Sequence, residues 1–209
     1  MNKRLQEGAM WEERFSSSNE YVFGKAPAQF LLDHQARLTR GHTALSVADG
    51  EGRNSVFMAQ QGLDVTALEF APSAIVRARA LADELGVSVD FQQLDIMADP
   101  WPDEQFDLVA GIFIQFVGPD GRRVQFQRMK DATKPGGLVM LHGYRPEQLE
   151  YGTGGPPFAQ NMYTEVILRA AFVGWEILDL REYDREVQEG SGHSGMSALI
   201  DLVARKPMD

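Results

Sequence analysis

The stretch that decides the fold is Leu45-Ser46-Val47-Ala48-Asp49-Gly50-Glu51-Gly52-Arg53-Asn54. Its apolar beginning predicts a short buried strand. Gly50 and Gly52 predict a tight turn, because glycine adopts backbone angles that other residues avoid. Residues 54–60 have a helix-compatible composition and end before Gly62. A helix that starts here turns its free N–H groups toward a ligand above the turn.

An acid follows this motif at an informative distance. Glu69 lies 19 residues beyond Gly50, at the end of a second apolar run, Val65-Thr66-Ala67-Leu68. A carboxylate at about that distance is placed to accept hydrogen bonds from ribose hydroxyls. The motif therefore predicts a nucleoside-containing cofactor at the carboxyl ends of parallel strands. A structural turn followed by a surface acid is the alternative interpretation.

The composition predicts one domain spanning residues 1–209. A hydrophobic fraction of 44% suits a globular core, and the absence of cysteine excludes disulfides and thiolate chemistry. The four histidines lack metal-ligand spacing, and no apolar run approaches the roughly 20 residues of a membrane span. Because the N-terminus also lacks an apolar signal core, we expect a cytoplasmic protein without metal or membrane. The net charge of −10 makes a nucleic acid a poor substrate.

Strands and helices alternate along most of the chain. Pro27 opens a predicted helix that continues to about Arg40. Beyond it, strands are predicted near residues 43–48, 64–69, 87–91, 106–113 and 138–142, and helices near 53–61, 72–86, 120–132 and 161–172. Lys134-Pro135-Gly136-Gly137 predicts a turn before the fifth strand. This alternation predicts a parallel sheet with helices on both faces.

The C-terminal part of the chain follows a different pattern. Two strand-like segments, Trp175 to Val187 and Ser197 to Lys206, are joined only by the glycine-rich stretch from Gly190 to Gly195. Two strands with so short a connection pair antiparallel. An α/β sheet that ends in an antiparallel hairpin is not the usual pattern of nicotinamide-binding proteins.

With these features in order, the chain resembles the class I S-adenosylmethionine-dependent methyltransferases over nearly its whole length. The resemblance implies an α/β, Rossmann-like, doubly wound and mostly parallel seven-stranded sheet with a C-terminal antiparallel hairpin. Residues 1–42 would form an N-terminal lid arm and helix, and residues 43–209 the Rossmann-like core. Within this superfamily, Gly50-Glu51-Gly52-Arg53-Asn54-Ser55 with Ala59 is similar to the tellurite-resistance group, which is related to small-molecule thiol methyltransferases.

The resemblance implies that S-adenosylmethionine is the cofactor and assigns residues to it. Backbone groups at Ala48, Gly50 and Gly52 would contact its methionine moiety and ribose, and Glu69 would accept both ribose hydroxyls. Two positions depart from the family, whose members usually carry an Asp and a glycine ahead of the loop where Ser46 and Ala48 stand here. The Ser46 hydroxyl would still organise the loop, whereas Ala48 leaves less room for the methionine moiety.

The same resemblance extends to the adenine and the sulfonium. Asp95 would accept from the adenine amino group and the Ile96 N–H would meet a ring nitrogen; a turn-capping role is the alternative for Asp95. Phe70 would stack on adenine, with a core phenylalanine as the alternative. Ile112, together with Phe113, would lie beside the sulfonium.

An aromatic block near the N-terminus, residues 11–15 and 21–24, looks like the lid of these enzymes. Arg14 would pair with the cofactor carboxylate, and Trp11 and Tyr21 would cover the ligand. The alternative is that these aromatic residues only staple an N-terminal arm to the core.

For the methyl acceptor, the candidates are His142, Tyr144, Arg145 and His193, each with a structural alternative. The loops at residues 143–148 and 151–157 would border the same rim. The expected reaction is in-line methyl transfer to a small molecule whose acceptor is a thiol, a chalcogen oxyanion or a hydroxyl. A hydroxyl would need a general base, for which His142 or His193 is the first choice.

Two further observations and two alternatives bound this prediction. Ile114-Gln115-Phe116-Val117 stands where relatives that methylate amides and adenine carry an Asn-Pro-Pro-aromatic tetrad, which argues against the exocyclic amines of DNA. A non-catalytic S-adenosylmethionine-binding protein is an alternative. A nicotinamide-dependent oxidoreductase is a weaker one, because Asn54 and Ser55 occupy the place of a third glycine. We expect a monomer or a homodimer.

Overall fold

A computed structural model describes residues 3–18, 20–102, 105–190 and 192–208. The chain divides into two compact units. The first comprises Met1–Asp99 with Glu189–Gly192, and the second comprises Pro100–Gln188 with His193–Asp209. Within the described residues, no helix is long and apolar enough to cross a membrane.

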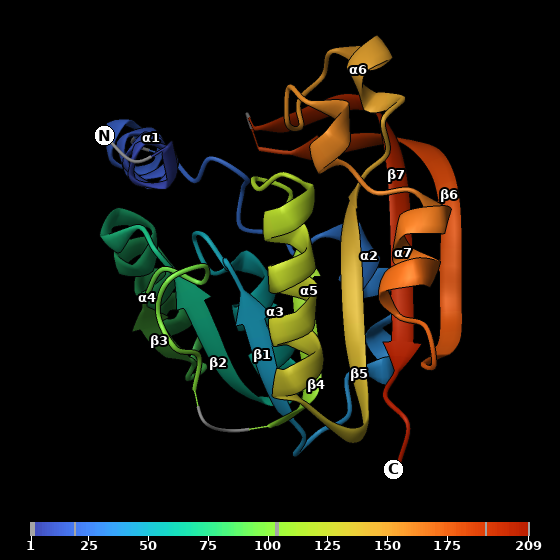
Figure 1. The fold of residues 1–209 in the computed structure, drawn as a ribbon. Coiled ribbons are helices and arrows are strands. Elements are labelled where there is room, and N and C mark those ends of the chain that lie inside the picture. The colour runs from blue at the N-terminus through green and yellow to red at the C-terminus, as the bar shows by residue number, and fades with distance from the viewer. Residues whose placement is uncertain (1–2, 19, 103–104, 191, 209) are drawn as a thin grey trace. The chain divides into compact units, whose positions relative to one another are not determined.

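The first unit is built on three parallel strands (Figure 1). Strands β1 (Thr43–Val47), β2 (Asp64–Glu69) and β3 (Asp90–Gln93) pair in the order β1-β2-β3. Helices α3 (Arg53–Gln60) and α4 (Pro72–Leu85) are the crossover connections. Pro72 is placed at the first turn of α4, and Gly86, with φ of 66°, ends this helix in the left-handed conformation. The helix begins and ends where the sequence predicts.

Three further segments complete the first unit before β1. They are α1 (Lys3–Ser17), α2 (Gln29–Asp33) and the 3-10 turn η1 (Gln35–Arg37). The predicted continuous helix from Pro27 to Arg40 is therefore wrong. The helix begins only at Gln29. The Ala28 N–H donates to Asn54 Oδ1 at 3.0 Å, and the Ala28 backbone, with ψ of 137°, is not helical. Its course is broken at His34, where φ of −110° and ψ of 16° leave the helical region.

The third predicted strand is displaced along the chain. Residues 87–91 alternate as a strand would, but β3 begins at Asp90, which pairs with Thr66. Val87 and Val89 instead pack against the core cluster that includes residues of α4, and of the apolar members of the set only Phe91 lies in the strand. The alternation here reflects burial against a helix rather than pairing.

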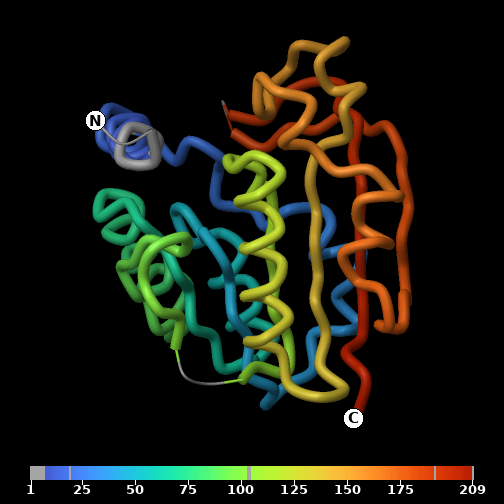
Figure 2. Tube along the Cα trace, in the orientation of Figure 1, coloured from blue at the N-terminus to red at the C-terminus, as the bar shows by residue number. Residues whose placement is uncertain are grey.

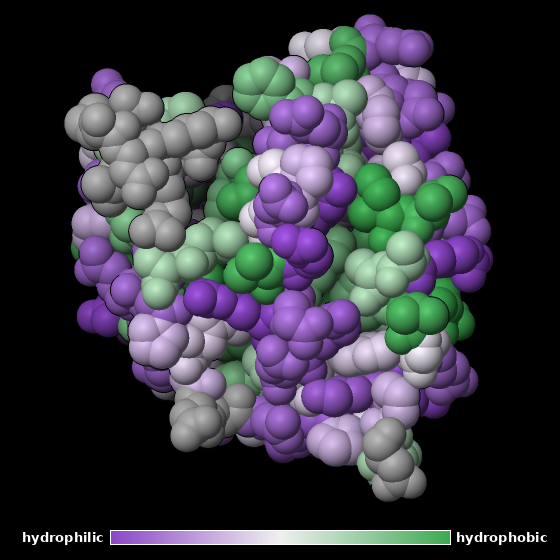
Figure 3. Space-filling view, viewed as in Figure 1, coloured by the Kyte–Doolittle hydropathy of each residue, from purple (hydrophilic) through white to green (hydrophobic). Residues whose placement is uncertain are grey.

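The second unit contains the remaining strands. β4 (Phe106–Ile112) pairs parallel with β5 (Thr133–Tyr144), and β5 pairs antiparallel with β7 (His193–Arg205). β6 (Glu176–Glu189) and β7 form the C-terminal hairpin, whose two strands run side by side in Figure 2. Helices α5 (Pro119–Ala132), α6 (Gln148–Tyr151) and α7 (Glu165–Ala171) and the 3-10 turn η2 (Ala159–Asn161) connect them. The outward surface of α5 is mostly hydrophilic (Figure 3).

Three predicted boundaries differ in this unit. Lys134-Pro135-Gly136-Gly137 is not a turn that precedes the strand but part of β5, where a register shift and a φ of 74° at Gly136 accommodate it. α7 begins later than residue 161, at the Thr164 cap whose hydroxyl accepts from the Ile167 N–H at 3.3 Å. β7 already begins at His193, inside the predicted loop.

Along the sheet the seven strands follow the order β3-β2-β1-β4-β5-β7-β6. This order, with its antiparallel C-terminal hairpin, confirms the predicted α/β, Rossmann-like fold.

Candidate functional site

The glycine loop joins β1 to α3 with three residues in the left-handed region. Ala48 has φ of 50°, Gly50 of 66° and Gly52 of 89°. At Gly52 an added Cβ would lie 2.7 Å from the Ala78 side chain, so the glycine is required by the packing of α3 on α4. At Gly50 the nearest atom to such a Cβ is on the Phe15 ring, at 3.7 Å. The space beside Gly50 therefore leaves room for a ligand to approach its backbone.

A buried carboxylate that the sequence analysis did not single out organises the loop. Ser46 Oγ donates to Asp49 Oδ1 at 2.6 Å, and Ser55 Oγ donates to Asp49 Oδ2 at 2.5 Å. Burial raises the pKa of the Asp49 carboxyl, although the two serine hydroxyls act in the opposite direction. The Ser46 hydroxyl thus organises the loop as expected, through Asp49.

The Glu69 side chain is fixed directly beside this loop. Its Oε2 accepts the Gly50 N–H and its Oε1 accepts the Ala71 N–H, both at 2.8 Å. Glu69 is only 7% exposed, which excludes the surface-acid alternative. Burial raises the pKa of this carboxyl, and the backbone N–H groups partly counteract that shift. A carboxylate offers about four acceptor positions, so beside these backbone N–H groups the oriented carboxylate is able to accept from a ribose.

The residues predicted for adenine follow β2 and β3. Asp95 Oδ1 accepts the Met97 N–H at 2.8 Å, which is the turn-capping role given as its alternative. Ile96 is buried, at 5% exposure. Phe70 is 36% exposed and therefore not a core residue; its ring lies against Gly8 of α1, where an added Cβ would come within 2.5 Å.

The N-terminal aromatic residues form a packed group in the first unit. The Trp11 ring stacks on Phe15 at 5.8 Å between centroids, and Arg14 Cζ lies 5.1 Å from the Trp11 centroid and 5.2 Å from that of Phe23. Tyr21 donates its hydroxyl to the Arg77 carbonyl at 3.0 Å, which makes it a staple to α4.

In the second unit, four rings gather at the carboxyl ends of β4 and β5. The Phe113 centroid lies 4.6 Å from His142, 4.8 Å from Tyr144 and 4.3 Å from His193. Phe113 follows Ile112 and has φ of 57°, a conformation that strains a non-glycine residue. Tyr144 is 2% exposed. Because all three rings lie beside Phe113, the predicted acceptor residues His142, Tyr144 and His193 share one cluster.

His142 is oriented by a carboxylate from β7. Its Nδ1 lies 2.6 Å from Asp201 Oδ1, and Arg181 Nε donates to Asp201 Oδ2 at 2.8 Å. Burial acts to raise the pKa of the Asp201 carboxyl, but the His142 and Arg181 interactions outweigh it and hold that pKa below its ordinary value. With Nδ1–H donated to the carboxylate, the neutral ring carries its acceptor on Nε2. Arg145, in contrast, pairs with Asp184 at 2.5 Å.

Two buried glutamines hold the backbone around Tyr144. Gln115 Oε1 accepts the Tyr144 N–H at 2.7 Å and its Nε2 donates to the Tyr144 carbonyl at 2.8 Å. An added Cβ at Gly143 would come within 2.7 Å of the Gln115 amide. Gln148 donates to Thr153 and to the Gly154 carbonyl, which ties down the glycine-rich loop.

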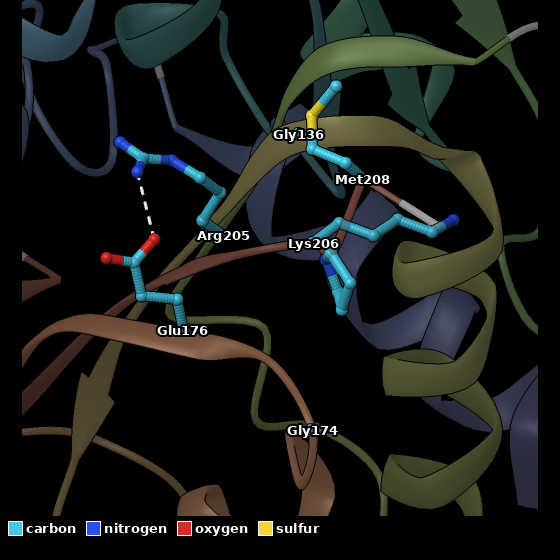
Figure 4. Close-up of a pocket in the computed structure, with 7 residues that line it drawn as sticks. Gly136, Gly174, Glu176, Arg205, Lys206 and Met208 are labelled. Carbon is cyan, nitrogen blue, oxygen red and sulfur yellow. Dashed lines mark hydrogen bonds and ion pairs between the residues drawn. The ribbon is translucent and has the colours of Figure 1, made fainter.

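A pocket of about 570 Å³ lies elsewhere in the second unit (Figure 4). It is lined by Gly136, Gly174, Glu176, Arg205, Lys206, Pro207 and Met208. Arg205 and Glu176 form an ion pair across it at 2.9 Å. The pocket is at the amino end of β5, the opposite end from His142 and Tyr144.

The chain is similar to known proteins over part of its length. Residues 44–137, somewhat under half of the chain, match the family described as Methyltransferase domain. The ubiquinone biosynthesis O-methyltransferase of Pseudomonas paraeruginosa is 36% identical over 112 residues, which are 53% of this chain and 47% of that one. An uncharacterized Mycobacterium tuberculosis protein is 27% identical over 114 residues, 54% of this chain; the chain spans only 41% of its length.

Solved structures show the same fold at low identity. One, from a study of the conversion of a disulfide bond into a thioacetal group during echinomycin biosynthesis, has a TM-score of 0.77 at 20% identity and covers 98% of this chain and 91% of its own. TehB from Haemophilus influenzae has a TM-score of 0.71 at 20% identity, covering 94% and 67%. The N-methyltransferase NodS of Bradyrhizobium japonicum with S-adenosyl-L-homocysteine has a TM-score of 0.70 at 15% identity, covering 96% and 99%.

The family match supports a methyltransferase domain over residues 44–137. The NodS structure holds S-adenosyl-L-homocysteine, the demethylated form of the expected cofactor. The residues of the first unit fit that cofactor: the loop leaves Gly50 open beside an oriented carboxylate at Glu69.

Proposed function

We propose that this protein transfers a methyl group from S-adenosylmethionine to a small-molecule acceptor in the cytoplasm. The observation that carries the proposal is the Glu69 carboxylate, held by the Gly50 and Ala71 N–H groups beside a loop of left-handed residues. Glu69 accepts the ribose hydroxyls, and backbone groups at Ala48, Gly50 and Gly52 meet the methionine moiety. Asp95, Ile96 and Phe70 border the adenine. Arg14, beside Trp11, pairs with the cofactor carboxylate.

The acceptor side in this proposal is the aromatic cluster around Phe113. When bound, S-adenosylmethionine supplies an electrophilic methyl group that is displaced in line. Phe113, Tyr144 and His193 offer an apolar, aromatic surface for a small acceptor, and Ile112 precedes them. A thiolate or chalcogen oxyanion needs no base. For a hydroxyl, His142 removes the proton through Nε2 while Asp201 holds its other nitrogen.

The Gln115 contacts favour such acceptors over amines. Its amide is bonded in both directions to the Tyr144 backbone, so it serves the protein chain instead of an incoming amide or amino group. The sulfur chemistry named for one structural neighbour and the O-methylation named for one relative are compatible with the same choice. Within this range, the tellurite-resistance and thiol group remains our preferred subgroup.

Further parts of the proposal concern organisation. Residues 1–209 act as one catalytic domain in which residues 1–42 form the lid arm and residues 43–209 the core. The protein works as a monomer or homodimer and does not act on nucleic acid, in keeping with its net charge of −10.

The test is a turnover screen with methyl-deuterated S-adenosylmethionine. Thiols, tellurite, selenite and small phenols are each incubated with the protein, and labelled products are measured by mass spectrometry. We expect transfer to at least one of these classes, and loss of transfer to phenols in His142→Ala. Binding of the cofactor without transfer to any of them would replace the proposal with a non-catalytic binding protein. Binding of NAD in its place would indicate an oxidoreductase.

A further inference from the structure

Polar side chains of the glycine loop reach a neighbouring stretch of backbone. We call residues 22–28 the strap. Glu51 Oε2 accepts the Val22 N–H at 2.7 Å, and Asn54 Oδ1 accepts the Ala28 N–H at 3.0 Å. Arg53 Nη1 lies 3.3 Å from the Phe23 carbonyl and 3.5 Å from that of Ala26. Three side chains of one short motif therefore hold the strap from end to end.

These contacts are buried and their charges are balanced. Glu51 is 3% exposed and receives Arg77 Nη1 at 2.6 Å. Arg53 is 6% exposed and pairs with Glu189 at 2.7 Å. Charged groups at such depth are held in one geometry, because leaving either partner alone is costly. The strap is consequently a rigid extension of the loop.

The strap in turn locates Arg14. The Arg14 guanidinium lies against both the Phe23 and the Trp11 ring, at 5.2 Å and 5.1 Å from their centroids. The Val22 carbonyl accepts the Gly192 N–H at 2.9 Å, which fixes the strap from its other side. An added Cβ at Gly192 would lie 2.4 Å from the Phe23 ring and 3.1 Å from Arg14 Nη2. Gly192 is therefore packed closely against both side chains, which limits their movement.

We propose that Glu51 and Arg53 are positioning residues for recognition of the cofactor carboxylate. They hold the strap, the strap holds Phe23, and Phe23 with Trp11 holds Arg14 where it pairs with that carboxylate. The inference rests on the proposed function, in which Arg14 has this role. An arginine ordered in advance loses less rotamer freedom on binding, so the pair raises affinity without touching the ligand.

The test compares two ligands by calorimetric titration. S-adenosylhomocysteine has the carboxylate, whereas 5′-methylthioadenosine shares the nucleoside and sulfur but lacks it. We expect Glu51→Ala to bind S-adenosylhomocysteine about tenfold more weakly, the scale of one charge-assisted hydrogen bond, and to bind methylthioadenosine within about twofold of wild type. In an Arg14→Met background, Glu51→Ala should cause no further loss of affinity for S-adenosylhomocysteine. Should Glu51→Ala not fold, Arg53→Lys and Glu51→Gln carry the same comparison.

The matched control is Lys25→Gln. Lys25 lies on the strap, but its ion pair with Glu84 at 2.5 Å is exposed and does not involve the loop. Lys25→Gln should leave the affinities for S-adenosylhomocysteine and methylthioadenosine unchanged. An equal loss for both ligands in Glu51→Ala, no loss for either, or additive losses with Arg14→Met would overturn the inference and leave the proposed function standing. Failure of the wild type to bind either ligand would overturn both.

Discussion

Replacing Ala48 with glycine should stabilise the protein, which is unusual for an alanine next to a strand. Ala48 has φ of 50° at the end of β1. The left-handed conformation costs a non-glycine residue roughly 1–2 kcal/mol. Glycine relieves that strain but loses about 0.5–1 kcal/mol through greater freedom in the unfolded chain. The free energy of unfolding should therefore rise by about 0.5–1 kcal/mol in Ala48→Gly.

Ala44→Gly is the matched control, because Ala44 lies in the same strand with an ordinary backbone and is fully buried. That change loses the same roughly 0.5–1 kcal/mol of backbone freedom and about 0.8 kcal/mol for the buried methyl group. The two variants should thus differ by roughly 2 kcal/mol, or about 4–8 °C in Tm for a chain of this size.

Urea unfolding followed by far-UV circular dichroism, with thermal melts alongside, measures both variants. Ala48→Gly should also bind S-adenosylhomocysteine at least as tightly as wild type, since it gives the methionine moiety more room. If Ala48→Gly destabilises the protein as much as Ala44→Gly does, the strain at Ala48 does not exist in solution and the reasoning is refuted.

Three other predictions follow from the site. Burial raises the pKa of Glu69, and ribose binding needs its carboxylate. Affinity for S-adenosylhomocysteine should therefore fall, as pH is lowered, at a value above the ordinary 4.5; a loss only below 4.5, seen by titration across pH, would contradict this. Gln115→Leu strands the Tyr144 N–H and carbonyl and should lower the free energy of unfolding by about 2–4 kcal/mol, measured in urea. Gln125→Leu, at a buried amide with no hydrogen-bond partner among the described residues, should be neutral or stabilising; equal losses in the two variants would refute that contrast.

Much of the fold was predictable because its signals are local. β2 spans the predicted residues 64–69, bounded by Gly62 and ending on Glu69. α4 spans Pro72–Leu85 because a proline and a glycine mark its two ends. The boundaries that failed depend on distant partners: Ala28 is held extended by Asn54, and residues 87–89 alternate for burial against α4.

The site divides in the same way. The spacing placed Glu69 beside the glycine loop, and the structure joins Gly50 and Glu69 by a hydrogen bond of 2.8 Å, a contact that was not predicted. The roles of Asp49, Glu51 and Arg53 were not predicted. Asp49 is bound by Ser46 and Ser55. Glu51 and Arg53 bind residues that are distant in the sequence, among them Val22 and Glu189. Asp49 between Ser46 and Ser55 was the one local signal for a buried carboxylate. Nothing in the sequence marks the left-handed Phe113.

The most direct test of the central claim is calorimetric titration of S-adenosylhomocysteine into wild type and Glu69→Ala. Losing two charge-assisted hydrogen bonds to ribose should weaken binding by at least about a hundredfold. We predict micromolar binding to wild type and no measurable binding to Glu69→Ala at the same concentrations. Equal affinity in both proteins would remove Glu69 from the cofactor site. No binding to wild type would leave a methyltransferase fold without the cofactor function proposed for it.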